Sequence, residues 1–544
     1  MVSPESWLDR LSGNLATHKL LPSIVALVSL VIIIFLGGLV PADNNLWLMF
    51  TQAIAYFLAR VIYNLKFHPL SNYPGPRLAA ITDIWWAYIR TTGRYPWIVE
   101  DALKQYGDII RIAPNELIFL TPRAAKDIYL LQDKNLELFV QVGYDALDTG
   151  DGGITGETNP IRHREIAKKL APAFSTRNLK AKEATILKRV DRFLNQMKEI
   201  GAQGKGADLQ CWTHWLALDL SVDMTYGRDM GQVRDMKDSV FLSGSLKLNL
   251  FVTMSEITRK IGLLSPLAYL TIPASVWVIM PKLIRMNTED VATRIGLRGK
   301  TEHLDYFEQL VPADQPVPTD KKRIYHLENV AGQLLLASWQ PLADQFYSLI
   351  FFLLRAPDAY SMLVEEVRAA FPTSDAINTE TTANLKYLQG CQRESLRLHQ
   401  ETVDGLPRVS PGAVVDVAYI PKGVICQISY FAAARSPRFF CNPLEFHPER
   451  WLSPDHPKFD AKYKDDDLAA SKPFSQGPRG CPGGAITMAV VRLFMAKVLW
   501  QFDLEAAPGY ENLSFEKDFK WLTFWERPQF WVRFKPVQRA KIDA

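Results

Sequence analysis

The sequence predicts a mainly α-helical fold with a small β-sheet portion, preceded by an N-terminal membrane anchor. Helical apolar periodicity dominates after residue 68, and two-residue alternation is confined to a few short runs. Hydrophobic residues make up 48% of the 544-residue chain and charged residues 22%, a composition that suits one large packed core. We therefore expect one large helical domain, the catalytic domain, over residues 68–544 and an anchor segment over residues 1–67.

Charge and cysteine content exclude several classes of protein. The formal net charge is +4, with 62 basic against 58 acidic residues, which is too even for a nucleic-acid-binding surface. The 5 cysteines are widely spaced and include no C-x-x-C pair, so we expect neither a disulfide framework nor a zinc site. The folded part is therefore expected in a reducing compartment.

Residues 20–40 form an apolar run without a single charge. At about 1.5 Å per helical residue this run can cross a bilayer core of about 30 Å, and it exceeds the apolar region of a cleaved signal peptide. A second apolar stretch, 46–65, is interrupted by Gln52 and Arg60, so a second span and an interfacial helix both remain open. Lysine and arginine flank these stretches so that the main domain faces the cytosol in either case.

Helical patterns and short β-like runs can be placed along the rest of the chain. The expected helices cover residues 96–107, 161–172, 178–199, 212–226, 322–356 and 356–371, and the expected strands cover 109–112, 116–120, 414–418 and 423–428. Residues 262–286 are apolar but contain three prolines, which leaves a buried core segment and a membrane-dipping lid as interpretations. The charged stretch at 462–467 is predicted to be a solvated loop.

Residues 474–483 read FSQGPRGCPG and form the most informative segment of the chain. Three glycines and two prolines among these residues predict a tight, specifically shaped loop. The residues that follow have helical periodicity, so Cys481 is expected just before a helix N-terminus, where the helix dipole and free N–H groups should lower the pKa of its thiol. A thiolate is the ligand that donates electron density to a haem iron and favours O–O cleavage.

This loop resembles the signature Phe-x-x-Gly-x-Arg-x-Cys-x-Gly of cytochromes P450 and matches it at every specified position. The resemblance covers about residues 68–535 and is greatest to filamentous-fungal enzymes of secondary metabolism. It implies the cytochrome P450 fold and a haem, iron protoporphyrin IX, whose iron is ligated by Cys481. It also implies that Phe474 packs beside the sulfur and that Arg479 pairs with a haem propionate.

Other positions fit the same family. The resemblance makes Arg408 and His163 further candidates for binding the propionates, although Ala167 stands where family members often have arginine. Glu394 and Arg397 are spaced i, i+3 on a helix, which by itself indicates only a surface ion pair. The resemblance implies instead a buried structural triad of these two residues with Arg450.

The predicted long helix departs from the family pattern. Cytochromes P450 carry [Ala/Gly]-Gly-x-[Asp/Glu]-Thr-Thr over the distal haem face, where this chain reads ASWQPL over residues 337–342. Gln340 replaces the acid and Pro341 the principal threonine. Glutamine orients water but is a poor proton donor, and proline lacks both a hydroxyl and an N–H and is expected to open the helix. Ser338 and Gln340 are the candidate catalytic residues that remain.

The resemblance implies a monooxygenase that oxidises a hydrophobic small molecule with O₂ and with electrons from NADPH. The implied donor is NADPH-cytochrome P450 reductase, with cytochrome b5 as an additional one, and the implied location is the endoplasmic reticulum membrane, with the catalytic domain in the cytosol. Basic residues near His163 are candidates for a basic face that docks an acidic reductase, or simply form a solvated helix face. They are Arg164, Lys168 and Lys169.

Several alternatives remain open from the sequence. The missing acid–threonine pair also suits phenol coupling, ring closure or desaturation without oxygen insertion, and an isomerase or dehydratase that acts on a peroxide. A haem-binding sensor and an inactive membrane scaffold are the alternatives from other classes. Candidate substrate-wall residues, each of which serves equally as ordinary core, are Phe139, Tyr144, Trp339, Val403, Leu406 and Phe524.

Overall fold

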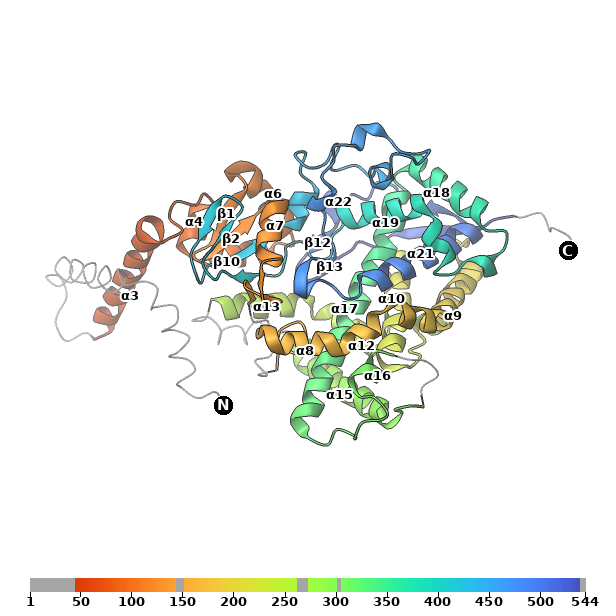
Figure 1. Cartoon of the computed structure of the whole chain (residues 1–544), viewed down its shortest axis with the longest axis horizontal. Coiled ribbons are helices and arrows are strands. Elements are labelled where there is room, and N and C mark those ends of the chain that lie inside the picture. Colours follow the sequence, from red (N-terminus) through yellow and green to blue (C-terminus); the bar gives the residue numbers. More distant parts are fainter. Residues whose placement is uncertain (1–44, 143–150, 262–272, 301–304, 539–544) are drawn as a thin grey trace.

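A computed structural model describes residues 45–142, 151–261, 273–300 and 305–538. The predicted membrane run at 20–40 lies outside these residues. Within them, helices form most of the body and a small sheet lies at one end, next to α3 (Asn45–Ile62), which projects away from it (Figure 1). The predicted mainly helical fold with a small β portion is confirmed.

The helices and strands follow the predicted ranges closely. The helices after α3 are α4 (Arg77–Ile81), α5 (Ile84–Thr91), α6 (Tyr95–Tyr106), α7 (Pro122–Tyr129), α8 (Pro160–Leu170), α9 (Thr176–Ile200), α10 (Leu209–Tyr226), α11 (Gln232–Asp235), α12 (Val240–Lys247), α13 (Asn249–Lys260), α15 (Ala274–Gly296), α16 (Tyr306–Leu310), α17 (Lys321–Leu353), α18 (Pro357–Ala370), α19 (Lys386–Leu398), α20 (Tyr430–Ala434), α21 (Gly484–Gln501) and α22 (Phe515–Asp518). The strands are β1 (Ile109–Ala113), β2 (Glu116–Phe119), β3 (Gln132–Asp133), β4 (Leu136–Glu137), β5 (Val140–Gln141), β6 (Ala207–Asp208), β7 (Arg408–Val409), β8 (Ala413–Val415), β9 (Ala418–Ile420), β10 (Ile425–Ile428), β11 (Phe502–Ala506), β12 (Lys520–Trp521), β13 (Trp525–Glu526) and β14 (Trp531–Pro536).

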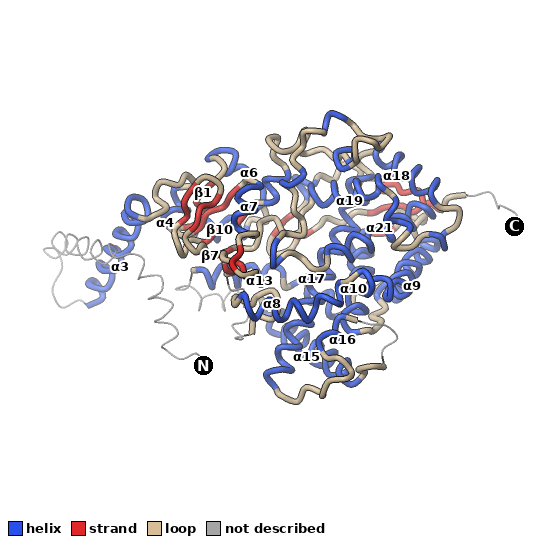
Figure 2. The backbone as a smooth tube through the Cα atoms, viewed as in Figure 1, coloured by secondary structure: helices blue, strands red, loops and turns tan. Residues whose placement is uncertain are grey.

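The main sheet has the strand order β1-β2-β10-β7-β5. Figure 2 shows its strands β1, β10 and β7 in red. β10 runs parallel to β2, and the other pairs are antiparallel. The predicted strand at 414–418 is wrong, because β8 and β9 form a hairpin that turns within it. Asp416 in that turn has a φ of 57°, a left-handed conformation that ends a strand.

The core is built around α17, which packs against α10, α15, α19 and α21. α17 continues through Pro341, and the surrounding helices bury its C-terminal half. The local opening at Pro341 stays a prediction. Among the described residues, α21 is the one helix long and apolar enough to cross a membrane, but 61% of it is buried in the protein. We therefore assign α21 to the core.

Two helices expose large apolar side chains. α3 confirms a helix within residues 46–65 and leaves Phe50 and Phe57 more than half exposed. In α15, Trp277 is 58% and Val278 is 74% exposed. The described part of residues 262–286 is thus a surface helix, and the buried-core interpretation is wrong there.

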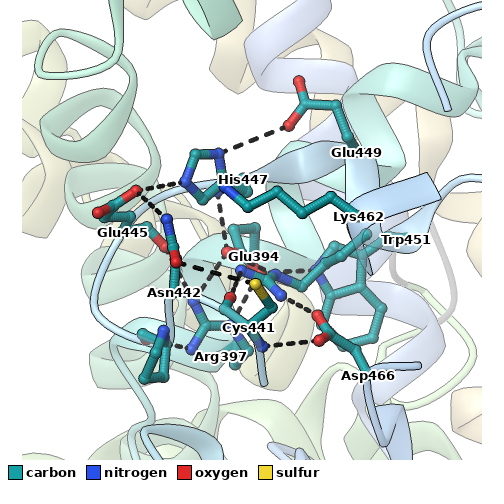
Figure 3. Close-up of polar contacts among 12 residues, drawn as sticks. Glu394, Arg397, Cys441, Asn442, Glu445, His447, Glu449, Trp451, Lys462 and Asp466 are labelled. Atoms are coloured by element: carbon teal, nitrogen blue, oxygen red, sulfur yellow. Dashed lines mark hydrogen bonds and ion pairs between the residues drawn. The ribbon is translucent and has the colours of Figure 1, made fainter. Parts of the chain in front are cut away.

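A buried ion-pair cluster joins α19 to the chain after α20 (Figure 3). Glu394 Oε1 lies 2.8 Å from Arg397 Nη2 and 3.1 Å from Arg450 Nε, which confirms the predicted triad. Trp451 Nε1 donates a 2.8 Å hydrogen bond to Glu394 Oε2. Asp466 completes the cluster by an ion pair with Arg450, so at this residue the predicted solvated loop at 462–467 is wrong.

We predict that Glu394→Gln lowers the free energy of unfolding by about 3–5 kcal/mol, because it leaves buried guanidinium groups short of an anion. Burial alone would raise the pKa of Glu394, but Arg397 and then Arg450 hold it below 4.5. The carboxylate therefore stabilises the fold above about pH 4.5 and loses this effect as the pH falls through its folded pKa. Denaturant titration measures the difference in free energy of unfolding between the wild type and the variant. This difference should become smaller as the pH falls below about 4.5.

The matched control is Glu380→Gln, since that side chain is 82% exposed and pairs with the exposed Lys180 at the surface. Its unfolding midpoint should equal that of the wild type. Equal midpoints for the wild type and Glu394→Gln at neutral pH would contradict the structural role of the cluster.

Candidate active site

The cysteine loop has a shape that its glycines make possible. The backbone N–H of Cys481 donates a 2.8 Å hydrogen bond to the carbonyl oxygen of Phe474. Gly477 has a φ of 80°, and a Cβ at this position would overlap the carbonyl oxygen of Tyr129. Only glycine fits there, since a side chain would meet both steric and conformational strain. Cys481 precedes α21 by three residues, so its predicted position before a helix N-terminus is confirmed.

The sulfur of Cys481 accepts hydrogen bonds from the backbone N–H groups of Gly483 and Gly484, as expected for a helix start. These donors lower the pKa of the thiol, as predicted for a helix start, but desolvation by the surrounding protein outweighs them and raises the pKa overall. Cys481 nevertheless keeps exposed surface. The ring of Phe474 lies against Gly484, 3.2 Å from where a Cβ would be. A thiolate here requires a cation such as a metal ion beside the sulfur.

Three basic side chains from distant segments lie near one another: His163 on α8, Arg408 on β7 and Arg479 in the cysteine loop. Burial, followed by the positive charges of Arg479 and Arg408, lowers the pKa of His163 to about 4, although the carboxylates of Glu137 and Glu157 raise it. His163 is therefore neutral near pH 7 and offers an N–H rather than a charge.

Arg479 is held by an acidic partner that the sequence did not reveal. Its Nε donates a 2.7 Å hydrogen bond to Glu137 Oε1, and its Nη1 donates to the carbonyl oxygen of Glu157. Its Nη2 is buried without a hydrogen-bond partner among the described residues. The guanidinium thus keeps one donor for an anion. No local signal could have indicated Glu137, which is 342 residues away in the chain.

Arg408 is also buried and lies over the ring of Tyr129, 5.2 Å from its centroid. Its Nη1 donates to the carbonyl oxygens of Leu406 and Pro407, at 3.0 and 3.2 Å. A cavity of about 280 Å³ borders this region and is lined by Gln132, Asn135, Glu137, His163, Arg164, Ala167 and Pro478. A cysteine sulfur together with clustered basic groups is a donor set that fits a haem with anionic propionates.

On α17, both predicted catalytic side chains are already engaged. The hydroxyl of Ser338 donates a 3.1 Å hydrogen bond to the carbonyl oxygen of Leu335, within its own helix. Gln340 is 3% exposed, and its Nε2 donates to Asp344 Oδ2 at 3.1 Å. Sequence reasoning missed Asp344, although an acid one helical turn after Gln340 is a detectable signal.

Some of the candidate wall residues are buried in the core, and others are half-buried. Phe139 and Val403 are 0% and 1% exposed and pack into hydrophobic core clusters, so they are core residues. Trp339 is 3% exposed and packs against His214 and Phe241. Leu406 and Phe524 are half-buried and remain candidate wall residues. Tyr144 lies outside the described residues.

Comparison with known proteins decides the family. The family model for cytochrome P450 matches residues 86–529. This chain belongs to the cytochrome P450 family. Similar P450 proteins include cytochrome P450 monooxygenase TwmD of Talaromyces wortmannii, 45% identical over 88% of this chain and 94% of that protein. Others are btcC of Colletotrichum orbiculare, 34% identical over 90% and 94%, and poxC of Penicillium oxalicum, 34% identical over 92% and 97%. The predicted family and enzyme class, a P450 oxidoreductase, are confirmed.

A cytochrome P450 uses a haem with a thiolate ligand, and the residues described above fit that group. Cys481 would ligate the iron, Arg408, Arg479 and His163 would hold the propionates, and Phe474 would shield the sulfur. When bound, the haem supplies the activation of O₂.

We predict that Cys481→Ala abolishes the red-shifted Soret band of the reduced, carbon-monoxide-treated holoprotein, because alanine offers no sulfur ligand. The matched control is Cys211→Ala, which should keep the band, since Cys211 lies on α10. Absorption spectra of both purified variants check this. A band that survives in Cys481→Ala would exclude this cysteine as the ligand.

We predict that Arg408→Gln accelerates haem loss about tenfold or more, because a charge-assisted hydrogen bond contributes about 1.5–3 kcal/mol. Haem transfer to excess apomyoglobin measures the rate. Arg123→Gln is the matched control, since that side chain is 68% exposed. Equal rates of haem loss for the two variants would show that Arg408 does not bind a propionate.

Proposed function

We propose that this cytochrome P450 is a membrane-anchored monooxygenase of secondary-metabolite biosynthesis, which inserts one oxygen atom of O₂ into a hydrophobic small molecule. The observation that carries the proposal is the cysteine loop before α21, beside the cluster of His163, Arg408 and Arg479. The fungal relatives that match nearly the whole chain are named cytochrome P450 monooxygenases, which supports oxygen insertion.

The half-buried apolar wall candidates support a hydrophobic substrate. Leu406 before β7 and Phe524 before β13 come from two separate segments of the chain. Apolar and aromatic linings with few polar groups select apolar ligands. We therefore propose a polyketide, terpenoid or aromatic metabolite as the substrate class.

A second function is favoured by one observation on α17. Ser338 and Gln340 both donate within their own helix, and Pro341 has no donor. An active site with poor proton supply suits phenol coupling, ring closure or desaturation, in which the substrate itself loses hydrogen. A peroxide isomerase or dehydratase is the remaining alternative, because it needs neither O₂ nor a reductase.

The proposed electron donor is NADPH-cytochrome P450 reductase, with cytochrome b5 as an additional donor. α8, which carries His163, exposes basic side chains on its outer face, and an acidic partner surface would complement them. These residues are Arg162, Arg164, Lys168 and Lys169. Docking there would bring the donor to the side of the protein that contains the propionate-binding candidates.

We also propose that the chain is held at the endoplasmic reticulum membrane by residues 1–67, with the catalytic domain in the cytosol. The uncharged run at 20–40 supports an anchor. The exposed apolar side chains of α3, such as Phe50 and Phe57, support a helix in contact with lipid, either as a second span or in the interface.

We predict that the full chain, supplied with reductase, NADPH and ¹⁸O₂, forms a product that contains one ¹⁸O atom from a panel of apolar fungal metabolites. Mass spectrometry reads the label, and Cys481→Ala is the inactive control. An NADPH-dependent product without label would favour coupling or desaturation over insertion. Product formation without NADPH would indicate the isomerase or dehydratase instead.

A further inference from the structure

A buried polar cluster begins one helical turn after Gln340. It contains Asp344 on α17, Glu401 in the segment after α19, and Arg527 between β13 and β14. Arg527 Nε lies 2.8 Å from Asp344 Oδ1 as an ion pair, and Gln340 Nε2 donates to Asp344 Oδ2 at 3.1 Å. The carboxyl group of Glu401 is in hydrogen-bonding contact with that of Asp344. We call these two acids the carboxyl pair.

The charges around the carboxyl pair do not balance if both acids are ionised. Arg527 also donates to the carbonyl oxygen of Ala343 at 2.7 Å and contacts His214 Nε2 at 2.6 Å. His214 faces the cluster from α10 and His399 from the end of α19. Burial first, and then Arg527, lowers the pKa of His214 well below its ordinary value, and burial lowers the pKa of His399 to about 4, so both rings are neutral near pH 7. One guanidinium therefore faces two acids.

Hydrogen bonding points to the same imbalance. Glu401 Oε2 is buried and has no hydrogen-bond partner among the described residues, whereas Asp344 Oδ1 faces Arg527 Nε. Two touching carboxylates cannot both stay ionised at low dielectric, whereas one proton between them turns the contact into an O–H···O bond. Burial and then the charge of Asp344 raise the pKa of Glu401 well above its ordinary value. Asp344, paired with Arg527, is thus the carboxylate, and Glu401 is the acid.

The two acids differ in accessibility. Asp344 is 3% exposed, whereas Glu401 is partly exposed. In the sequence, Glu401 lies between Arg397 of the ion-pair cluster and Arg408 of the haem site. Trp339 Nε1, next to Gln340, is also buried without a partner among the described residues, so this region offers a second polar atom to water or substrate.

We propose that the carboxyl pair is the proton source of the active site, with Glu401 as the catalytic acid that replaces the family's missing acid and threonine. Asp344 and Gln340 are positioning residues: Asp344 keeps the proton on Glu401, and the amide of Gln340 fixes the orientation of Asp344. This inference rests on the proposed oxygen insertion.

The proton balance of the proposal is complete. A monooxygenase combines R–H, O₂, two electrons and two protons to give R–OH and H₂O, and the reductase supplies the electrons from NADPH. The Glu401 O–H bond breaks, and its proton moves to an acceptor in the active site. The carboxylate that remains is stabilised by Arg527 until water returns a proton, after which Glu401 supplies the second one.

The test is Glu401→Gln in the full chain with reductase and a converted substrate. Glutamine keeps the shape but cannot release a proton, so product formed per NADPH should fall at least tenfold while hydrogen peroxide release rises. Substrate affinity and the red-shifted Soret band should be unchanged. Glu401→Asp should restore part of the product yield, and the exposed-site control Glu380→Gln should match the wild type.

A readout without turnover comes from infrared difference spectra of the oxidised holoprotein at neutral pH. The wild type should show the C=O stretch of a protonated carboxyl group that is absent in Glu401→Gln. In Asp344→Asn the same band should disappear at a lower pH than in the wild type, because Glu401 then faces Arg527 without a competing negative charge.

Two results would overturn the inference: a wild type without the band, or a Glu401→Gln variant that forms as much product per NADPH as the wild type. If Glu401→Gln fails to retain haem, the wild-type band and its shift in Asp344→Asn decide the question. A wild type that shows the band but forms no labelled product would overturn the proposed function instead.

Discussion

The fixed shape of the loop around Cys481 is the constraint on which the active site depends. Gly477 has a conformation and a space that exclude side chains, and the loop holds the sulfur just before the start of α21. Two backbone N–H groups there donate to the sulfur and lower its pKa, whereas desolvation by the surrounding protein raises it. A haem iron bound to this sulfur would add the positive charge that favours the thiolate.

Several buried charges in this fold are matched by side chains of opposite charge. Glu394 is matched by Arg397 and Arg450, Arg450 in turn by Asp466, and Arg479 by Glu137. Glu394 and Arg397 lie on one helix, whereas Glu394 with Arg450 and Arg479 with Glu137 join segments that are distant in sequence. Because an unpaired charge in the core costs several kcal/mol, these two longer-range pairs also fix the relative placement of their segments.

The α17 segment that carries the acid and threonine in other family members keeps its helix here but not those side chains. Pro341 removes an alcohol and an N–H from α17 without interrupting the helix, since tertiary packing holds the backbone on both sides. Carboxyl groups are present nearby instead: Asp344 lies one helical turn after Gln340, and Glu401 comes from the segment after α19. The acids are buried near a single guanidinium, and a shortage of positive charge is what keeps one of them protonated.

The sequence alone determined the features that depend on neighbours along the chain. Helical periodicity located α6, α9, α10, α17 and α18 to within a few residues, and the spacing of the cysteine loop predicted both the family and the position of Cys481. Tertiary structure decided what depends on contact and burial: the hairpin turn at Asp416, the pairing of Arg479 with Glu137, the place of Asp466 in the ion-pair cluster, and the contact of Glu401 with Asp344. It also added the desolvation that raises the pKa of Cys481 against the lowering effect of the helix start. Local patterns report which residues share a helix face, but desolvation and long-range charge pairing exist only once distant segments have packed together.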